Sequence, residues 1–324
     1  MTNQRRTDGS LRHLITLESL SRSEITQLLD QAQHFVRPLG APAPTNRALR
    51  GVTIGNLFTE PSTRTRVSFE LAGRRLGAEV INLEVQLSSR AKGESMLDTI
   101  HTLEALHFDV FVIRDSEPGV VATVAANVAP HVSVLSAGEA HLSHPTQGLL
   151  DALTVRQCKG ERFDNLCIAI VGDLRHSRVA RSAYEVFTAL GVGELRLIAP
   201  HGLMPEAAEF PLGRRLSSPE EGLRDADVIM MLRLQKERMA AADIPDGADY
   251  FARFGLDLPR LRLAKPDAIV MHPQPMNRGI EIDTAVADGP QSVIRQQVRN
   301  GVAVRMAVLD AVARPRAAGP AGPR

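Results

Sequence analysis

Short apolar runs alternate with amphipathic stretches along this sequence, and the alternation occurs twice. Strand-like runs occupy 51–58, 78–85, 109–114 and 131–137 in the first half, and 165–173, 194–200, 227–233 and 268–273 in the second. Helices are expected at 62–76, 94–106, 178–191 and 219–225. Repeated strand–helix alternation favours parallel sheets flanked by helices. We therefore predict an α/β protein of two domains, each with a mainly parallel sheet, and an active site between them.

Two further predicted helices set the limits of the domains. One covers 144–157, where Pro145 suits a first helical turn, and the other covers 292–313. The first domain is expected at 1–145 and the second at 146–291, with the final helix packing back on the first. Residues 314–324 are rich in Pro, Gly and Ala, so we predict a disordered tail.

Composition excludes several classes of protein. The net charge is +1, which does not indicate a nucleic-acid partner. No apolar run approaches the about 18 residues of a membrane span, and the N-terminus lacks a signal-peptide pattern. The two cysteines, Cys158 and Cys167, match no zinc or disulfide pattern, so a reducing, cytoplasmic location is expected. Neither G-x-G-x-x-G nor G-x-x-x-x-G-K-[ST] occurs, and we expect no NAD, ATP or other cofactor.

The densest polar cluster follows the first predicted strand. Ser62, Thr63, Arg64, Thr65 and Arg66 are consecutive and open a predicted helix. The first N–H groups of a helix have no internal partner, so hydroxyl and guanidinium groups at that place predict a phosphate site. The alternative is an ordinary N-cap with solvated arginines, in which Arg66 pairs with Glu70. Five such residues together favour the anion site.

The sequence resembles the aspartate and ornithine carbamoyltransferases over about residues 11–313. Three motifs carry the resemblance: this cluster, "HPTQGLLD" and "VIRDSEPG". The resemblance implies that the carbamoyl phosphate ligands in the first domain are Ser62, Thr63, Arg64, Thr65, Arg114 and His144, joined by Gln147. It implies catalytic roles for Arg64, Thr65, Arg114 and His144, as donors to the carbonyl oxygen and the departing phosphate. No metal is expected, since His141 and His144 lack a third ligand nearby in the sequence.

The second half resembles the aspartate-binding members of the family more than the ornithine-binding ones. Arg178 and Arg233 can pair with two carboxylates, and by resemblance Gln235 and Lys92 join them. "MHPQPMNRG" stands where ornithine enzymes have "HCLP", and the backbone carbonyls of Gln274 and Pro275 are expected to hold the carbamoyl amine. Arg175, Arg181, Lys236 and Arg238 are interpreted as solvated.

The resemblance implies transfer of a carbamoyl group to L-aspartate in pyrimidine synthesis, by a homotrimer with shared active sites. A regulatory or dihydroorotase-like partner remains an open alternative. Two other hypotheses are an ornithine-type enzyme and a non-catalytic subunit of a larger assembly. Thr59, Asp115 and Gln274 depart from the common family pattern. They remove no required cation or hydroxyl, so we expect them to affect rate and affinity rather than the type of reaction.

Overall fold

The computed structural model describes residues 4–38, 40–41, 46–83, 95–235, 239 and 245–317. The chain forms two compact units. Unit 1 comprises Met1–Thr146 and Asn300–Arg324, and unit 2 comprises Gln147–Arg299. The chain passes from one unit to the other within helix α5 (Pro145–Lys159) and again within helix α11 (Ile294–Ala317).

Unit 1 contains a four-stranded sheet in the order β2-β1-β3-β4, and all of its strand pairs are parallel. Its strands are β1 (Thr53–Phe58), β2 (Glu79–Leu83), β3 (Val110–Asp115) and β4 (Ser133–Glu139). β1, β3 and β4 are almost wholly buried, whereas the edge strand β2 is largely exposed. Parallel strands covered on both faces need this continuous apolar character, which is why they read as apolar runs in the sequence.

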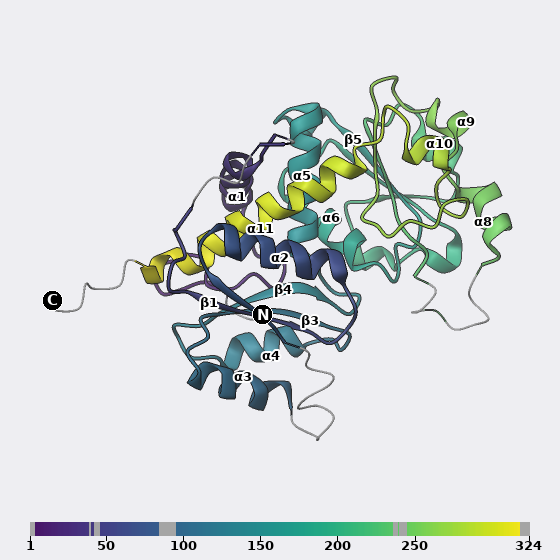
Figure 1. Ribbon diagram of the computed structural model, residues 1–324. Coiled ribbons are helices and arrows are strands. Elements are labelled where there is room, and N and C mark those ends of the chain that lie inside the picture. Colours follow the sequence, from purple (N-terminus) through teal and green to yellow (C-terminus); the bar gives the residue numbers. More distant parts are fainter. Residues whose placement is uncertain are drawn as a thin grey trace. The chain divides into compact units, whose positions relative to one another are not determined.

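Helices cover both faces of the unit 1 sheet (Figure 1). α2 (Thr63–Arg75) and the later part of α11 lie on one face, where Arg305 sits 5.1 Å from the centre of the Phe69 ring. α3 (Met96–Ala105) and α4 (Val120–Asn127) lie on the other, over a core that includes Leu57, Phe111 and Ile113. On α2 the Phe69 side chain is buried, while Val67 and Leu71 are exposed.

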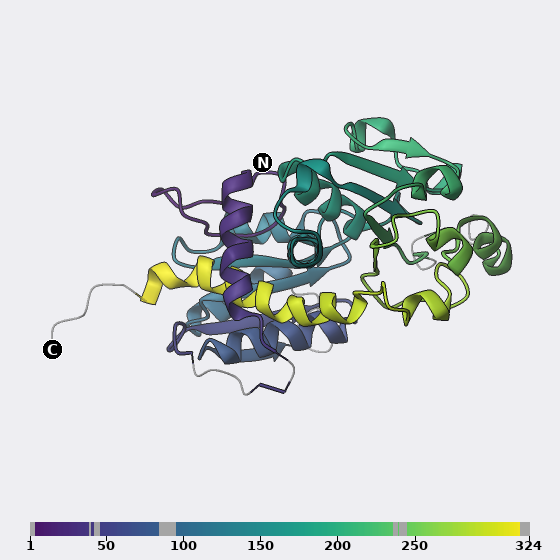
Figure 2. The same cartoon turned by 90° about the horizontal axis from the view of Figure 1, so that it is seen from above.

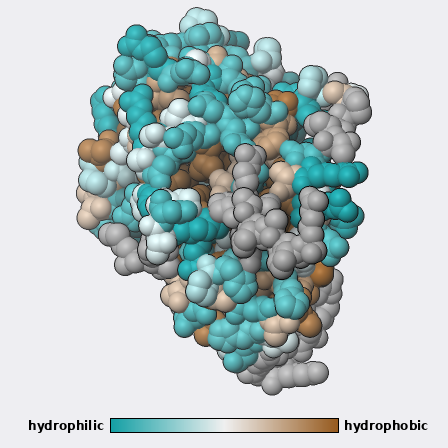
Figure 3. Space-filling view, turned by 90° about the vertical axis from the view of Figure 1, so that its left-hand side faces the viewer, coloured by the Kyte–Doolittle hydropathy of each residue, from teal (hydrophilic) through white to brown (hydrophobic). Residues whose placement is uncertain are grey.

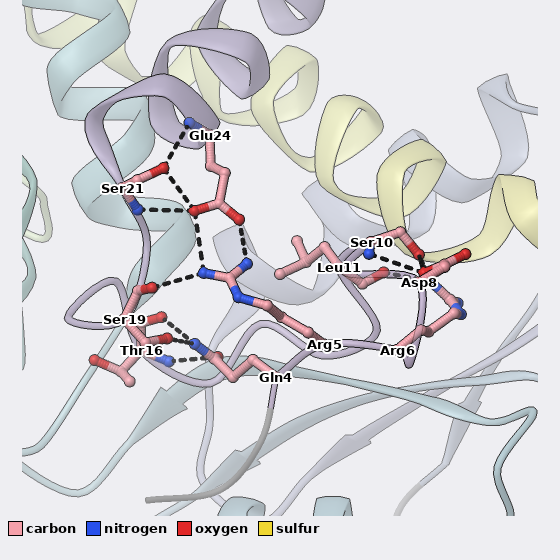
Figure 4. Close-up of polar contacts among 10 residues, drawn as sticks. All are labelled: Gln4, Arg5, Arg6, Asp8, Ser10, Leu11, Thr16, Ser19, Ser21 and Glu24. Carbon is pink, nitrogen blue, oxygen red and sulfur yellow. Dashed lines mark hydrogen bonds and ion pairs between the residues drawn. The ribbon is translucent and has the colours of Figure 1, made fainter.

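The N-terminal segment is fastened to the start of α1 (Arg22–Phe35) (Figure 4). Ser21 and Glu24 form a reciprocal capping box, and the Arg5 guanidinium donates to the Glu24 carboxylate. Gln4 donates to the Thr16 carbonyl at 3.1 Å. α1 lies beside α11 in both ribbon views (Figures 1 and 2), and Gln31 donates to Asp310 there.

Unit 2 contains a five-stranded parallel sheet in the order β7-β6-β5-β8-β9. The strands are β5 (Cys167–Val171), β6 (Glu194–Ile198), β7 (Arg214–Leu216), β8 (Val228–Met231) and β9 (Ile269–Met271). Besides α5, its helices are α6 (Arg178–Ala189), α7 (Pro219–Leu223), α8 (Gly247–Phe254), α9 (Leu258–Leu261) and α10 (Thr284–Ala287). The central strands β5 and β8 are completely buried.

The predicted fold class is confirmed, and each predicted strand has a counterpart in the structure. Sequence patterns did not indicate β7, α1, α4, α8, α9 or α10, most of which are short. The final helix, expected at 292–313, spans Ile294–Ala317, four residues beyond the predicted end.

Hydrophilic residues cover most of the face shown in Figure 3, and hydrophobic residues reach that surface in small groups. Single exposed apolar side chains, such as Leu106 and Leu212, are normal for a folded protein. Among the described residues, no helix is both long and apolar enough to cross a lipid bilayer.

Gly172, directly after β5, is a position where only glycine fits. Its φ is +130°, and an added Cβ would lie 2.7 Å from the Leu232 carbonyl oxygen. We predict that Gly172→Ala lowers the free energy of unfolding by about 1–3 kcal/mol, through backbone strain and the close contact. Gly202→Ala is the control, because nothing lies within 4 Å of the Cβ that it would add. Urea unfolding measures the stability of both variants. Equal stabilities would show that position 172 does not require glycine.

Candidate active site

Three adjacent strands of unit 1 bring the predicted carbamoyl phosphate ligands to one edge of the sheet. β1 leads into Ser62–Thr65, Arg114 is the fifth residue of β3, and β4 leads toward His144. β1 pairs with β3 and β3 pairs with β4, all in parallel. The carboxyl ends of these strands therefore meet at the same edge, which is where such sheets bind ligands.

The start of α2 is open to an external hydrogen-bond acceptor. Ser62 is its N-cap residue, but its side chain makes no capping hydrogen bond. In α1, α3 and α6 the cap residues Ser21, Ser95 and Ser177 do accept from the helix. Thr65 is buried, whereas Thr63 and Arg64 are exposed. The alternative interpretation expected Glu70 to pair with Arg66. In the structure Glu70 Oε1 instead lies 3.0 Å from Arg74 Nη2.

Arg114 is held in place from three sides. Its backbone carbonyl accepts hydrogen bonds from the Thr59 N–H at 3.0 Å and from the Thr59 hydroxyl at 3.2 Å. Its Nη1 donates to the Ala137 carbonyl at 3.2 Å, and its Nε lies 3.0 Å from Glu60 Oε1. The guanidinium side chain is only 12% exposed. Thr59, which departs from the family pattern, thus ties the end of β1 to Arg114.

His144 is buried at the residue before α5 begins. The turn that leads to it is closed by hydrogen bonds between Glu139 and Ser143. Burial raises the pKa of the Glu139 carboxyl, although its Oε1 accepts from the Val121 N–H at 2.8 Å. The nearby Asp115 carboxylate also raises this pKa. Glu139 thereby links the start of α4 to the turn that carries His144.

Unit 2 gathers its predicted aspartate ligands at the carboxyl ends of β5 and β8, which are paired. Arg178 is buried as the first residue of α6, which Ser177 caps by accepting from the Ala180 N–H. Arg233 and Gln235 follow β8, and Arg233 Nη2 lies 3.3 Å from Gln235 Oε1. All three side chains follow neighbouring strands on one edge of the unit 2 sheet.

Asp173 connects the two strand ends of unit 2. This buried carboxylate accepts from the Gln235 N–H at 3.2 Å, and from the N–H and Nδ1 of His176 at 3.1 and 2.9 Å. Burial raises the pKa of the Tyr250 hydroxyl, and the Asp173 and Glu281 carboxylates add to the shift. Asp173 is an acidic residue, hydrogen-bonded to the Gln235 backbone, that sequence reasoning did not single out.

Gln147 and the Gln274–Pro275 turn complete the predicted ligands of unit 2. Gln147 Nε2 donates to Asp151 Oδ1, one helical turn later in α5, at 3.0 Å. Gln274 and Pro275 follow β9, joined by a cis peptide bond, and Gln274 has a φ of +58°. The Gln274 N–H donates to His272 Nδ1 at 2.9 Å.

Lys92, with its predicted role in a neighbouring site, lies outside the described residues. Sequence reasoning also missed several side chains that hold predicted ligands in place: Glu60, Asp151, Asp173, His272 and Gln297. Asp151 could have been found by its i,i+4 spacing from Gln147, and Glu60 by its place beside the Ser62 cluster. Across the part of the chain that the structure describes, no group of three or more His, Cys, Asp or Glu could hold a metal ion.

Comparison with known proteins gives matches in both halves of the chain. Residues 12–157 match the carbamoyl-P binding domain of the aspartate/ornithine carbamoyltransferases, and residues 164–312 match their Asp/Orn binding domain. Aspartate transcarbamoylase from Trypanosoma cruzi, solved with carbamoyl phosphate, is 34% identical with a TM-score of 0.82, covering 93% of this chain and 96% of that one.

Two further solved structures are similar. The same Trypanosoma cruzi enzyme with N-(phosphonacetyl)-L-aspartic acid gives 34% identity and a TM-score of 0.84, over 95% of this chain and 98% of that one. Ornithine carbamoyltransferase from Pyrococcus furiosus gives 29% identity and a TM-score of 0.82, over 93% and 97%. Because the family models match both halves of the chain, it belongs to the aspartate/ornithine carbamoyltransferase family.

Proposed function

We propose that the chain transfers the carbamoyl group of carbamoyl phosphate to the amino group of L-aspartate, giving N-carbamoyl-L-aspartate and phosphate. This is a step of pyrimidine synthesis. The observation that carries the carbamoyl phosphate half is the start of α2, where the Ser62 side chain does not cap its own helix and Arg64 is exposed in the first turn. Unsatisfied N–H groups, the helix dipole and a cation together suit a phosphate.

The proposed chemistry needs donors rather than a protein nucleophile. The amine nitrogen attacks the carbamoyl carbon, the carbon–oxygen bond to phosphate breaks, and the amine proton passes to a phosphate oxygen. Thr65, Arg114 and His144 donate to the carbonyl oxygen as it becomes negative, and Arg64 stabilises the leaving phosphate. Ser62 and Thr63 hold the phosphate. Gln147 and the backbone carbonyls of Gln274 and Pro275 hold the carbamoyl amide.

Aspartate is favoured over ornithine by the two cations of unit 2. Arg178 and Arg233 follow the paired strands β5 and β8, and guanidinium groups bind carboxylates in a bidentate way. Gln235 and Lys92 complete the proposed aspartate ligands. The Asp173 carboxylate, which could otherwise favour an ammonium group, already accepts from Gln235 and His176. Solved complexes of the Trypanosoma cruzi relative contain carbamoyl phosphate and aspartate, or carbamoyl aspartate and phosphate, which supports the same substrates here.

Ornithine is the second candidate acceptor, because an ornithine carbamoyltransferase is also similar to this chain. A turnover assay of the purified chain with aspartate and ornithine in parallel decides between them. Absence of turnover with both acceptors would favour a non-catalytic subunit. We further propose a homotrimer with shared active sites, in which Lys92 acts on the substrates of a neighbouring chain.

The first prediction concerns the anion site. Arg64→Ala should lower kcat/KM for carbamoyl phosphate by about two to three decades, or about 2–4 kcal/mol, because a charge-assisted bond to phosphate is lost. Arg66→Ala is the matched control, since Arg66 is exposed on the same first turn. If the Arg64 variant stays within about threefold of wild type, the assignment is wrong.

The second prediction concerns the acceptor. Arg233→Ala should raise KM for aspartate far more than KM for carbamoyl phosphate, because it removes one partner of a carboxylate. Arg175→Ala, which changes an exposed arginine in the same unit, should leave both constants near wild type. Equal effects of Arg233→Ala on the two substrates would place this side chain outside the aspartate site.

The third prediction tests shared sites. An Arg64→Ala chain and a Lys92→Ala chain, each nearly inactive alone, are dissociated, mixed in equal amounts and reassembled. If each site uses both chains, about a quarter of the sites in a random cyclic trimer regain an intact set. Native mass spectrometry confirms mixed trimers. Activity that remains at the level of the separate variants would exclude the shared site.

A further inference from the structure

We propose that Gln297 of α11 is a positioning residue for carbamoyl transfer, which aligns the Gln147 side chain with the Gln274–Pro275 turn. The inference rests on the proposed function, in which both groups hold the carbamoyl amide. All residues in the argument belong to unit 2. Gln297 touches no substrate in this proposal, and acts through Asp151 on one side and His272 on the other.

The first link joins α11 to α5. Gln297 Nε2 donates to Asp151 Oδ1 at 2.8 Å, and Gln147 Nε2 donates to the same oxygen at 3.0 Å. Gln147 and Asp151 are four residues apart, so they lie on one face of α5. One carboxylate oxygen therefore sets the position of both amide groups. A shift of Gln297 moves the acceptor that orients Gln147.

The second link joins α11 to the turn after β9. Gln297 Oε1 accepts from the His272 N–H at 2.9 Å, and His272 Nδ1 accepts from the Gln274 N–H at 2.9 Å. Since Nδ1 accepts, the ring proton is on Nε2, which lies 3.2 Å from Glu281 Oε1. The imidazole is thus held in one tautomer, with its Nδ1 side fixing the backbone of Gln274.

The Gln297 amide has one orientation in this network. Its NH₂ faces a carboxylate and its carbonyl faces an N–H, so reversing the amide would oppose donor to donor and acceptor to acceptor. Gln297 is 2% exposed, His272 is 1% exposed, and Asp151 is fully buried. Water therefore has little access to replace a broken bond, and the lost alignment would persist.

Other contacts already hold the same elements together. On α11 the preceding residue, Gln296, donates to Gln157 of α5 at 2.7 Å. The backbone of β9 is tied to residues just before α11 by Val270 N–H to Gln291 O at 2.8 Å and Val293 N–H to Val270 O at 3.0 Å. Packing of α11 on α5 and β9 thus has support without Gln297. The distinct contribution of Gln297 is to align Gln147 with His272, and through His272 with the Gln274–Pro275 turn.

The decisive experiment compares Gln297→Met with Gln296→Met in the full-length protein. Methionine keeps the length of glutamine but cannot make its amide hydrogen bonds, and each variant removes side-chain contacts between α11 and α5. We expect Gln297→Met to lower kcat by about tenfold or more, because misplaced groups cost rate steeply, with a smaller change in KM for aspartate. Gln296→Met should remain within about twofold of wild type.

Hydrogen–deuterium exchange of the peptide covering 272–281 provides a readout that does not depend on activity. Gln297→Met should speed exchange there, because the His272 N–H loses its acceptor and the ring that accepts from the Gln274 N–H is no longer held, while Gln296→Met should not. Unchanged exchange, or equal kcat for the two variants, overturns the inference. If the wild-type chain is inactive with both aspartate and ornithine, the proposed function is overturned instead. The exchange result would still test the hydrogen-bonded link.

A second pair of variants serves if Gln297→Met does not fold. His272→Asn keeps an acceptor at the Nδ1 position for the Gln274 N–H, whereas His272→Gln keeps only a donor at the Nε2 position. We expect the Asn variant to retain about tenfold more kcat than the Gln variant, since alignment depends on the Gln274 bond. Equal activities, or the reverse order, would show that His272 does not transmit alignment to the turn.

Discussion

Parallel pairing of neighbouring strands is the constraint on which the rest of this structure depends. In unit 1 the pairing of β1 with β3 and of β3 with β4 brings three loops to one edge of the sheet. In unit 2 the pairing of β5 with β8 and of β8 with β9 does the same. Each loop alone presents a few polar groups, and only a shared edge concentrates them into a binding surface. Crossover helices bury both faces and leave that edge as the natural place for ligands.

A second layer of side chains turns this edge into a defined geometry. Thr59 holds the Arg114 backbone, Glu60 lies against its guanidinium, and Asp173 holds the loop that carries Gln235. Buried hydrogen bonds of this kind are stronger than exposed ones, and they cost more when one partner is removed. Departures from the family pattern, such as Thr59, are therefore absorbed by local contacts while the cations and hydroxyls are kept.

The acceptor side shows how two family members with different substrates can share one fold. The same paired strand ends could present cations to a dicarboxylate or an acid to an ammonium group. Here Arg178 and Arg233 supply positive charge, while the carboxylate of Asp173 is occupied by hydrogen bonds from its own unit. Substrate choice would then depend on the side chains at the strand ends rather than on the backbone.

Apolar runs and polar junctions are local features of the sequence. They were enough to predict the strand–helix order, the α/β class, and the cluster from Ser62 to Thr65 at a helix start. Helices such as α8, α9 and α10 escaped prediction because their short lengths give little periodicity. The contacts of Arg114 with Glu60 and of Gln297 with Asp151 and His272 could not be predicted, because they join residues far apart in sequence. Tertiary structure alone decides such contacts, since strand order and helix packing determine which distant side chains meet in a buried, hydrogen-bonded network.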